Sequence, residues 1–255
     1  MTHRMYLTAI PALIALLFAN AEAHMNHAED TSTQAGISVA ATLPPAPQIT
    51  PSPSSGATPT RVPAPQVTHT IVFLGNSLTE GMFATTQARD YAYTTAAQTG
   101  KTFVVEGQYG VTAVYTAQKM QASNPKLKVI PGDALYVVIE LGTNDVAASG
   151  ETLTQFKTAY DYILARVQRD APNARLICLG TWRDPSAGVS ESGHAYNQII
   201  QSDCPNTYIP LGDLYLNNSY HGPAGRSTWL GTGDWFHPND AGHAAIAARV
   251  AVVIS

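Results

Sequence analysis

A serine, a histidine and an aspartate in this chain have the types and spacing needed for nucleophilic attack on a carbonyl carbon. Ser77 follows an apolar stretch, and Asp234 stands three residues before His237 near the other end of the chain. A serine hydroxyl becomes a useful nucleophile when an imidazole accepts its proton, and the imidazole needs a third group to orient it. On one tight turn, the Asp234 carboxylate can hold Nδ1 of His237 while Nε2 faces Ser77. We therefore predict Ser77 as nucleophile, His237 as base and Asp234 as its orienting acid.

Acyl transfer also requires hydrogen-bond donors for an oxyanion, and three candidates follow apolar stretches. They are the backbone N–H groups of Ser77 and Gly110 and the side-chain amide of Asn144. A glycine at 110 lets the backbone approach a substrate closely. Each residue taken alone has an ordinary explanation, such as a turn serine, a turn glycine or a helix cap. Their joint appearance, in chain order after predicted strands, favours the catalytic interpretation.

Alternating strands and helices must position these residues. Five apolar, β-branched and nearly continuous stretches predict strands buried on both faces: 69–75, 101–107, 133–142, 174–182 and 206–212. Amphipathic stretches predict helices over 111–124, 151–171, 192–204 and 238–255. This alternation predicts an α/β fold, a three-layer α/β/α sandwich around a parallel sheet of about five strands. Ligands bind at the carboxyl ends of such strands, which the candidate residues follow.

The charge and the histidine spacing of the chain argue against a nucleic-acid partner and a metal site. The chain has 255 residues with a net charge of −4, and its Lys and Arg residues are scattered, so we expect no nucleic-acid partner. Three further histidines, His194, His221 and His243, lack the spacing of zinc ligands, and we predict no metal site. No feature of the sequence indicates an oligomeric state.

The N-terminal quarter of the chain differs from the rest. Residues 1–23 have a basic start, an apolar run and small residues at the end, which predicts a signal peptide rather than a stable membrane anchor. Residues 24–67 are rich in Pro, Ser, Thr and Ala, which predicts a flexible linker. Residues 68–255 then form the catalytic domain. We expect a secreted or periplasmic protein.

The chain has two cysteines, Cys178 in a predicted strand and Cys204 before another. An even number of cysteines in an exported protein permits one disulfide. Buried free thiols explain the same residues, because Cys178 also fits an ordinary core position. The sequence leaves both interpretations open.

Four blocks of the sequence resemble the signature of the SGNH (GDSL-type) hydrolases. They are GNSLTEG with Ser77, GQYGVTA with Gly110, GTND with Asn144, and DWFHP with Asp234 and His237. They occur in the family's order between residue 70 and the C-terminus. The resemblance implies a flavodoxin-like sandwich and a serine esterase with a Ser-His-Asp triad. It also implies an oxyanion hole of Ser77, Gly110 and Asn144, and no metal or organic cofactor.

Two positions depart from the family's pattern. Asn76 replaces the usual Asp before the nucleophile, which keeps the size of that side chain but removes its charge. Tyr109 replaces the common Ser in the second block, so Gly107 competes with Gly110 for the oxyanion role, and the following Val-Thr favours Gly110. Glu140, on the strand before GTND, is predicted to be structural and to need hydrogen-bond partners in the core.

The substrate class stays open between several esters. Trp182 and Trp235 are predicted to contact substrate, since aromatic rings suit both sugars and acyl chains. Export and a flexible linker fit deacetylation of a polysaccharide, and we expect a small-molecule or polysaccharide ester as substrate. The alternatives are a lipid esterase or lysophospholipase, a thioesterase, an acyltransferase to a sugar, or a non-catalytic carbohydrate-binding protein.

Overall fold

A computed structural model describes residues 70–122, 130–148, 150–184 and 193–255. Its centre is a five-stranded, all-parallel sheet with the strand order β2-β1-β3-β4-β5. The strands are β1 (Ile71–Gly75), β2 (Phe103–Gly107), β3 (Tyr136–Glu140), β4 (Arg175–Leu179) and β5 (Thr207–Ile209). Every residue of β1 is buried, as its continuous apolar sequence predicts. The predicted parallel sheet is therefore confirmed.

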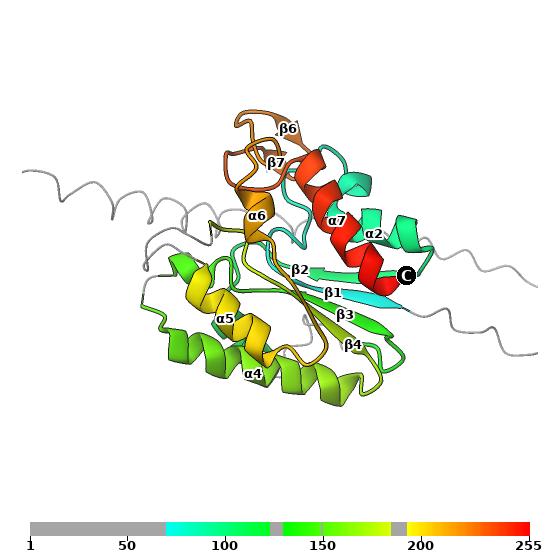
Figure 1. Cartoon of the computed structure of the whole chain (residues 1–255), viewed down its shortest axis with the longest axis vertical. Coiled ribbons are helices and arrows are strands. Elements are labelled where there is room, and N and C mark those ends of the chain that lie inside the picture. The colour runs from blue at the N-terminus through cyan, green and yellow to red at the C-terminus, as the bar shows by residue number, and fades with distance from the viewer. Residues whose placement is uncertain (1–69, 123–129, 149, 185–192) are drawn as a thin grey trace, which may run out of the picture. The chain divides into compact units, whose positions relative to one another are not determined.

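Helices cover both faces of this sheet (Figure 1). One face packs against α3 (Ala113–Gln121), α4 (Leu153–Asp170) and α5 (His194–Asp203). The other packs against α2 (Tyr91–Thr99), α6 (Gly212–Tyr215) and α7 (Asp240–Ile254). Each face has its own apolar core, so the three-layer α/β/α sandwich is confirmed. Among the described residues, no helix combines the length and the apolar character that crossing a membrane requires.

The long helices follow from local sequence. In α4 the buried side chains recur every three or four residues, and a capping box of Thr152 and Gln155 satisfies its first N–H groups. The side chain of Asn239 caps α7 by accepting the N–H groups of Ala241 and Gly242. These two helices lie within the ranges 151–171 and 238–255 that the sequence predicts.

The sequence pattern misses several short elements. It does not predict α2, because the buried face of that helix consists of Tyr91, Ala92, Thr95 and Ala96, which give a weak apolar signal. It also does not predict α6 or the small antiparallel pair β6 (Ser227–Thr228) and β7 (Gly231–Thr232). Two single-turn 3₁₀ helices, η1 (Gln87–Arg89) and η2 (Asp145–Ala147), complete the described elements.

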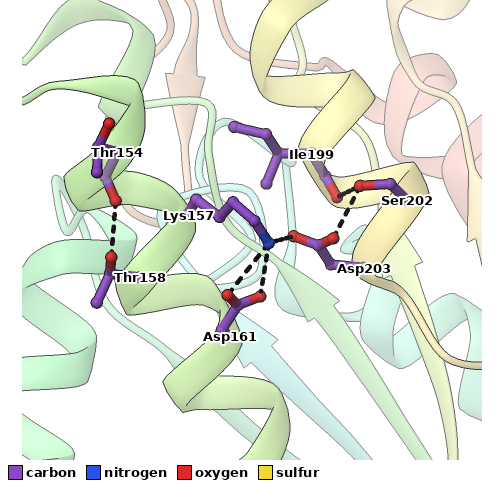
Figure 2. A network of polar contacts seen from close by, with 7 residues as sticks. All are labelled: Thr154, Lys157, Thr158, Asp161, Ile199, Ser202 and Asp203. Carbon is purple, nitrogen blue, oxygen red and sulfur yellow. Dashed lines mark hydrogen bonds and ion pairs between the residues drawn. The ribbon is translucent and has the colours of Figure 1, made fainter.

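Neighbouring helices α4 and α5 are joined at their surface by a charged network (Figure 2). Lys157 Nζ lies 3.1 Å from Asp161 on its own helix and 2.6 Å from Asp203 on α5. Ser202 Oγ donates to the other oxygen of Asp203 at 2.8 Å. Because Lys157 is half exposed, we expect these ion pairs to add little to the stability of the fold and mainly to orient α4 and α5 relative to each other.

Cys178 and Cys204 form a disulfide with a Cα–Cα distance of 6.1 Å. Cys178 is fully buried on β4, and Cys204 follows the last residue of α5. The bond therefore ties the sheet to a helix that covers it. Of the two interpretations that the sequence leaves open, the structure has the disulfide. The predicted signal peptide, residues 1–23, and the linker, residues 24–67, lie outside the described residues.

Candidate active site

Ser77 lies in the turn that follows β1, the second strand of the sheet from its β2 edge. The side-chain oxygen of Asn76 accepts the backbone N–H of Leu78 at 3.0 Å and so fixes this turn. Ser77 is 2% exposed, and its Oγ lies 2.9 Å from Nε2 of His237. The buried hydroxyl thus faces a group that can accept its proton.

Asp234 holds His237 from the opposite side of the ring. Its Oδ2 lies 2.8 Å from Nδ1 of His237, and its Oδ1 accepts the backbone N–H groups of Phe236 and His237, both at 2.8 Å. The short turn therefore fixes the carboxylate by its own backbone. Because a carboxylate only accepts hydrogen bonds, Nδ1 carries the proton and Nε2 presents a lone pair to Ser77.

The environment keeps Asp234 ionised. Partial burial acts to raise the pKa of Asp234, but the hydrogen bond and charge of His237, together with the two backbone N–H groups, outweigh burial and hold the pKa below its usual value. An ionised Asp234 can stabilise the imidazolium that would form when His237 accepts a proton.

Three aromatic rings surround the imidazole of His237. Their centroids lie 4.6 Å from it for Phe83, 5.2 Å for Phe236 and 6.5 Å for Tyr109. Phe83 has a positive φ of 69°, which a residue with a side chain rarely adopts. Sequence reasoning misses Phe83 altogether, because no local motif marks it. The sequence marks Tyr109 only as a departure from a family block.

The segment around Phe83 is held by a distant tryptophan. Nε1 of Trp229 donates to the carbonyl of Gly81 at 2.8 Å, and the backbone N–H of Trp229 donates to the carbonyl of Ala84 at 3.3 Å. The surrounding contacts thus offset the unfavourable backbone conformation of Phe83. Such strain is concentrated at functional sites.

The predicted oxyanion donors lie on adjoining turns. Asn144 Nδ2 donates one hydrogen to the carbonyl of Val111 at 2.9 Å, and an amide NH₂ has a second hydrogen to offer. Gly110 has a φ of 74°, and no atom beyond its chain neighbours lies within 4 Å of the position that a Cβ would occupy. Its backbone conformation, rather than a crowded neighbour, therefore favours glycine at this position.

Asp145 joins the two turns that carry these donors. Both of its carboxylate oxygens accept the backbone N–H of Ala113, at 2.9 and 3.1 Å, at the start of α3. The hydroxyl of Thr112 caps the same helix by accepting the N–H of Tyr115. Burial raises the pKa of Asp145 to about 7, although these backbone bonds oppose the shift. The turn that carries Asn144 is thereby tied to the turn that carries Gly110.

The two tryptophans predicted to bind substrate lie in different environments. Trp182 is fully buried, and its Nε1 donates to the carbonyl of Phe236 at 2.8 Å, directly before His237. Since the ring of Trp182 packs inside the core, we correct the expectation for this residue: it supports the histidine loop and offers no exposed face to a substrate. Trp235 is 67% exposed, next to the catalytic candidates in the chain.

His243 and His221 form hydrogen bonds outside the candidate triad. His243 is fully buried, with Nδ1 accepting the N–H of Tyr91 at 3.3 Å and Nε2 lying 3.0 Å from the carbonyl of Met82. Burial lowers its pKa to about 4, so it stays neutral. Nε2 of His221 lies 3.1 Å from the carbonyl of Tyr215. Over the described ranges, no group of three or more His, Cys, Asp or Glu side chains is placed to hold a metal ion.

Proteins of known structure share this fold. A Corynascus thermopiles (Myceliophthora fergusii) carbohydrate esterase family 2 enzyme matches with a TM-score of 0.56 and 18% identity, over 77% of this chain and 68% of that one. An active-site mutant of a family two carbohydrate esterase from Clostridium thermocellum matches with a TM-score of 0.53 and 19% identity, over 76% and 65%. A two-domain esterase active on acetylated mannans has a TM-score of 0.52 and 18% identity, over 72% and 47%. At these identities the likeness concerns the fold.

Sequence comparison adds a relative and a family. The chain is 32% identical over 118 residues to the cellulase/esterase CelE of Acetivibrio thermocellus. That stretch covers 46% of this chain but only 14% of CelE, and the chain spans about half of the two-domain esterase. Residues 73–245 match the GDSL-like Lipase/Acylhydrolase family, a range that runs from β1 into α7 and includes every catalytic candidate. The chain therefore belongs to the GDSL-like lipase/acylhydrolase family.

Proposed function

We propose that this protein is a secreted carboxylic ester hydrolase that removes acetyl groups from carbohydrate. The single observation that carries the catalytic part is the unbroken hydrogen-bond chain from Ser77 Oγ through His237 to Asp234. Membership of an acylhydrolase family supports the same chemistry.

In the proposed reaction Ser77 Oγ attacks the ester carbonyl carbon and gives its proton to Nε2 of His237. The negative charge that develops on the carbonyl oxygen is stabilised by the backbone N–H groups of Ser77 and Gly110 and the free amide hydrogen of Asn144. When the tetrahedral intermediate collapses, the alcohol leaves with the proton from His237 and the acyl group stays on Ser77. Water, deprotonated by His237, then releases the acid and restores the serine. No metal or organic cofactor takes part in these steps.

A carbohydrate substrate is supported by aromatic side chains near the site and by the similarity to the cellulase/esterase CelE. Trp235 and Tyr109 are 67% and 40% exposed, and the Tyr109 ring stacks at 27° to the ring of His237. Exposed aromatic rings offer flat apolar faces to sugar rings. Among the proteins that share the fold, one is an esterase active on acetylated mannans and two are carbohydrate esterases.

Hydrolysis of p-nitrophenyl acetate tests the catalytic part. The Ser77→Ala variant is expected to lose at least about 10³-fold in kcat. Ser202→Ala, which changes an exposed serine on α5, is the matched control and should keep the wild-type rate. Equal rates for wild type and Ser77→Ala would remove Ser77 from the mechanism. Absence of activity on a broad ester panel would favour the non-catalytic carbohydrate-binding alternative.

The substrate is tested with p-nitrophenyl esters of rising chain length beside acetylated polysaccharides. We expect a preference for acetate, and Trp235→Ala should raise KM for the polysaccharide while leaving kcat for p-nitrophenyl acetate unchanged. A preference for long acyl chains would support a lipid esterase or lysophospholipase instead, and rapid cleavage of acyl thioesters a thioesterase. Product analysis with a sugar acceptor present distinguishes hydrolysis from acyl transfer.

Secretion rests on the sequence of residues 1–23, with residues 24–67 as a linker and residues 68–255 as the catalytic domain. Expression of the full chain followed by mass measurement of the mature protein tests this division. A mature N-terminus near residue 24 in the extracytoplasmic fraction supports it. An uncleaved chain retained in the cytoplasm contradicts it.

A further inference from the structure

Glu140 is a fully buried carboxyl group that the proposed reaction does not use. It is the last residue of β3, directly beside the end of β1 in the sheet. Its oxygens receive hydrogen bonds from four atoms: Asn76 N (3.4 Å), Asn76 Nδ2 (3.0 Å), Thr79 Oγ1 (3.3 Å) and Thr143 Oγ1 (3.1 Å). One side chain thus contacts the turn that carries Ser77 and the turn that carries Asn144.

The direction of these bonds follows from their surroundings. The two nitrogen atoms of Asn76 can only donate. Thr143 Oγ1 accepts the backbone N–H of Trp182 at 3.0 Å, so its own hydrogen points to Glu140. Thr79 Oγ1 has Tyr91 Oη as a second partner at 2.8 Å, which can donate in the same way. Glu140 therefore acts as the shared acceptor at the junction of the two turns.

Both polar atoms of the Asn76 side chain form hydrogen bonds. Its Oδ1 accepts the N–H of Leu78, which fixes the orientation of the amide, and its Nδ2 then faces Oε1 of Glu140. An ionised aspartate at position 76 could not donate. It would also place a second carboxyl group within hydrogen-bond distance of Glu140, and two such groups cannot both ionise without strong repulsion.

We propose that Asn76 and Glu140 form a positioning pair, with Asn76 as donor and Glu140 as acceptor, that sets the Ser77 nucleophile against the Asn144 oxyanion donor. The inference rests on the proposed function, because it assigns the pair to that reaction. Neither side chain is a catalytic residue. Each acts through the turn that it holds.

Three variants test the pair: Glu140→Gln, Asn76→Asp, and the double variant. In Glu140→Gln, an amide NH₂ at the Oε1 position would face the NH₂ of Asn76, so two donors oppose each other. We expect kcat for p-nitrophenyl acetate to fall about 10- to 100-fold with KM within about twofold, because the reacting groups are displaced rather than lost.

Asn76→Asp should show a different signature. At low pH the two carboxyl groups share a proton and the hydrogen bond survives, so the rate stays near that of the wild type. As pH rises the shared proton is lost and the two carboxylates repel, so kcat should fall about tenfold or more relative to wild type.

Other titratable groups near Glu140 do not produce this decline. Within the described part of the chain, Tyr91 on α2 and Tyr160 on α4 interact electrostatically with the Glu140 carboxyl group. Burial raises the pKa of both phenols well above the usual value, so both stay neutral over the pH range of the assay. Burial raises the pKa of Glu140 itself to about 8 in the wild type, although the hydrogen bonds from Thr143, Asn76 and Thr79 oppose the shift. The decline of the variant is therefore measured against the wild-type profile, and the difference reports on the second carboxyl group of the pair.

The double variant Asn76→Asp/Glu140→Gln reverses the polarity of the pair. The NH₂ group introduced at position 140 can donate to the new carboxylate, but it no longer accepts the hydroxyl hydrogen of Thr143, so the rescue is partial. The carbonyl oxygen of the same amide replaces Oε2 as acceptor of the backbone N–H of residue 76 and of the Thr79 hydroxyl. We expect kcat to rise above that of either single variant and the alkaline decline to disappear, a strongly non-additive double-mutant cycle.

Asp90→Asn is the matched control. Asp90 is also fully buried, and it caps α2 by accepting the N–H of Ala92, a role that Asn fills as well. We expect this variant to change the unfolding midpoint without changing kcat or the pH profile of the rate. All rates are measured well below the midpoint of the least stable variant.

The outcomes separate the inference from the proposed function. Suppose that Ser77→Ala is inactive but the pair variants behave like Asp90→Asn. That result overturns the inference alone, and so does a double variant that is as impaired as the worse single variant. Undiminished activity in Ser77→Ala refutes the proposed function, and the inference falls with it because no nucleophile remains to be positioned. The kcat effect, the alkaline decline in Asn76→Asp and its rescue together support the pair.

Discussion

The orientation of His237 depends on which atom of residue 234 faces it, and Asp234→Asn tests this dependence. Oδ1 of Asp234 accepts two backbone N–H groups at 2.8 Å, so an asparagine must keep its carbonyl oxygen there. Its NH₂ then faces Nδ1 of His237 in place of Oδ2. Since an NH₂ group only donates, Nδ1 must become the acceptor and the ring proton must move to Nε2. Nε2 then donates to Ser77 Oγ and can no longer accept its proton.

The size of the effect follows from the loss of the general base while the geometry stays intact. In serine proteases with a Ser-His-Asp triad, the same substitution lowers kcat about 10⁴-fold, which corresponds to about 5.5 kcal/mol of transition-state stabilisation. We expect a similar loss here for p-nitrophenyl acetate. KM should change little, because no substrate contact is removed.

The assay compares wild type, Asp234→Asn and Asp213→Asn. The last is the matched control, because it alters an exposed carboxylate that pairs with Arg249 on α7. Nitrogen NMR shifts of the His237 ring report the tautomer directly. A kcat loss below about tenfold, or a larger loss with the proton still on Nδ1, would show that Asp234 does not act by setting the tautomer.

Three further predictions concern stability and support of the site. Replacing Cys178 and Cys204 by Ala should lower the free energy of unfolding in urea by about 3–4 kcal/mol, because the disulfide closes a loop with a sequence separation of 26 and so restricts the unfolded chain. A reductant that destabilises this variant further would contradict the assignment of the lost stability to the disulfide. Trp182→Phe removes the donor to the Phe236 carbonyl and should cost about 1–3 kcal/mol of stability together with a reduced kcat, whereas Trp235→Phe should leave both unchanged. Burial raises the pKa of Asp90 and Asp145 to about 7 in the folded protein, so these carboxyl groups contribute stability that is fully present below their ordinary pKa of 3.8 and is lost as pH rises through 7. Urea titrations should show this contribution as a decline in the free energy of unfolding between about pH 4 and 7 that Asp90→Asn reduces, and an identical decline in that variant would count against a protonated Asp90.

The local sequence pattern predicts the sheet well because each strand can be recognised from its own composition. Strands such as β1 and β3 consist almost entirely of apolar residues, several of them β-branched, and burial on both faces favours that composition. Helix α4 is likewise evident from its periodicity. Helix α2 is not, because its buried face includes Thr95 and two alanines, which give little contrast with its exposed face.

Some residues of the candidate site can be predicted from sequence, and others cannot. Ser77, Asn144, Asp234 and His237 can be named from sequence because each stands in a short block after a predicted strand or before a predicted helix. Trp182 and Trp235 have the same residue type, yet one is fully buried and the other is 67% exposed. Nothing in the local sequence distinguishes them, since burial depends on which loop packs over each ring.

Local sequence is enough to establish the α/β class, the order of strands β1 to β5 and of helices α3, α4, α5 and α7 along the chain, and the residue types at the strand ends, because these depend on neighbours within about ten positions. Three features required tertiary packing: the pairing of Cys178 with Cys204, the placement of Phe83 against His237 and the four bonds that converge on Glu140. Each of these joins segments that lie apart in the chain. Their contact depends on the register of parallel strands and on how the loops pack, which no local pattern specifies.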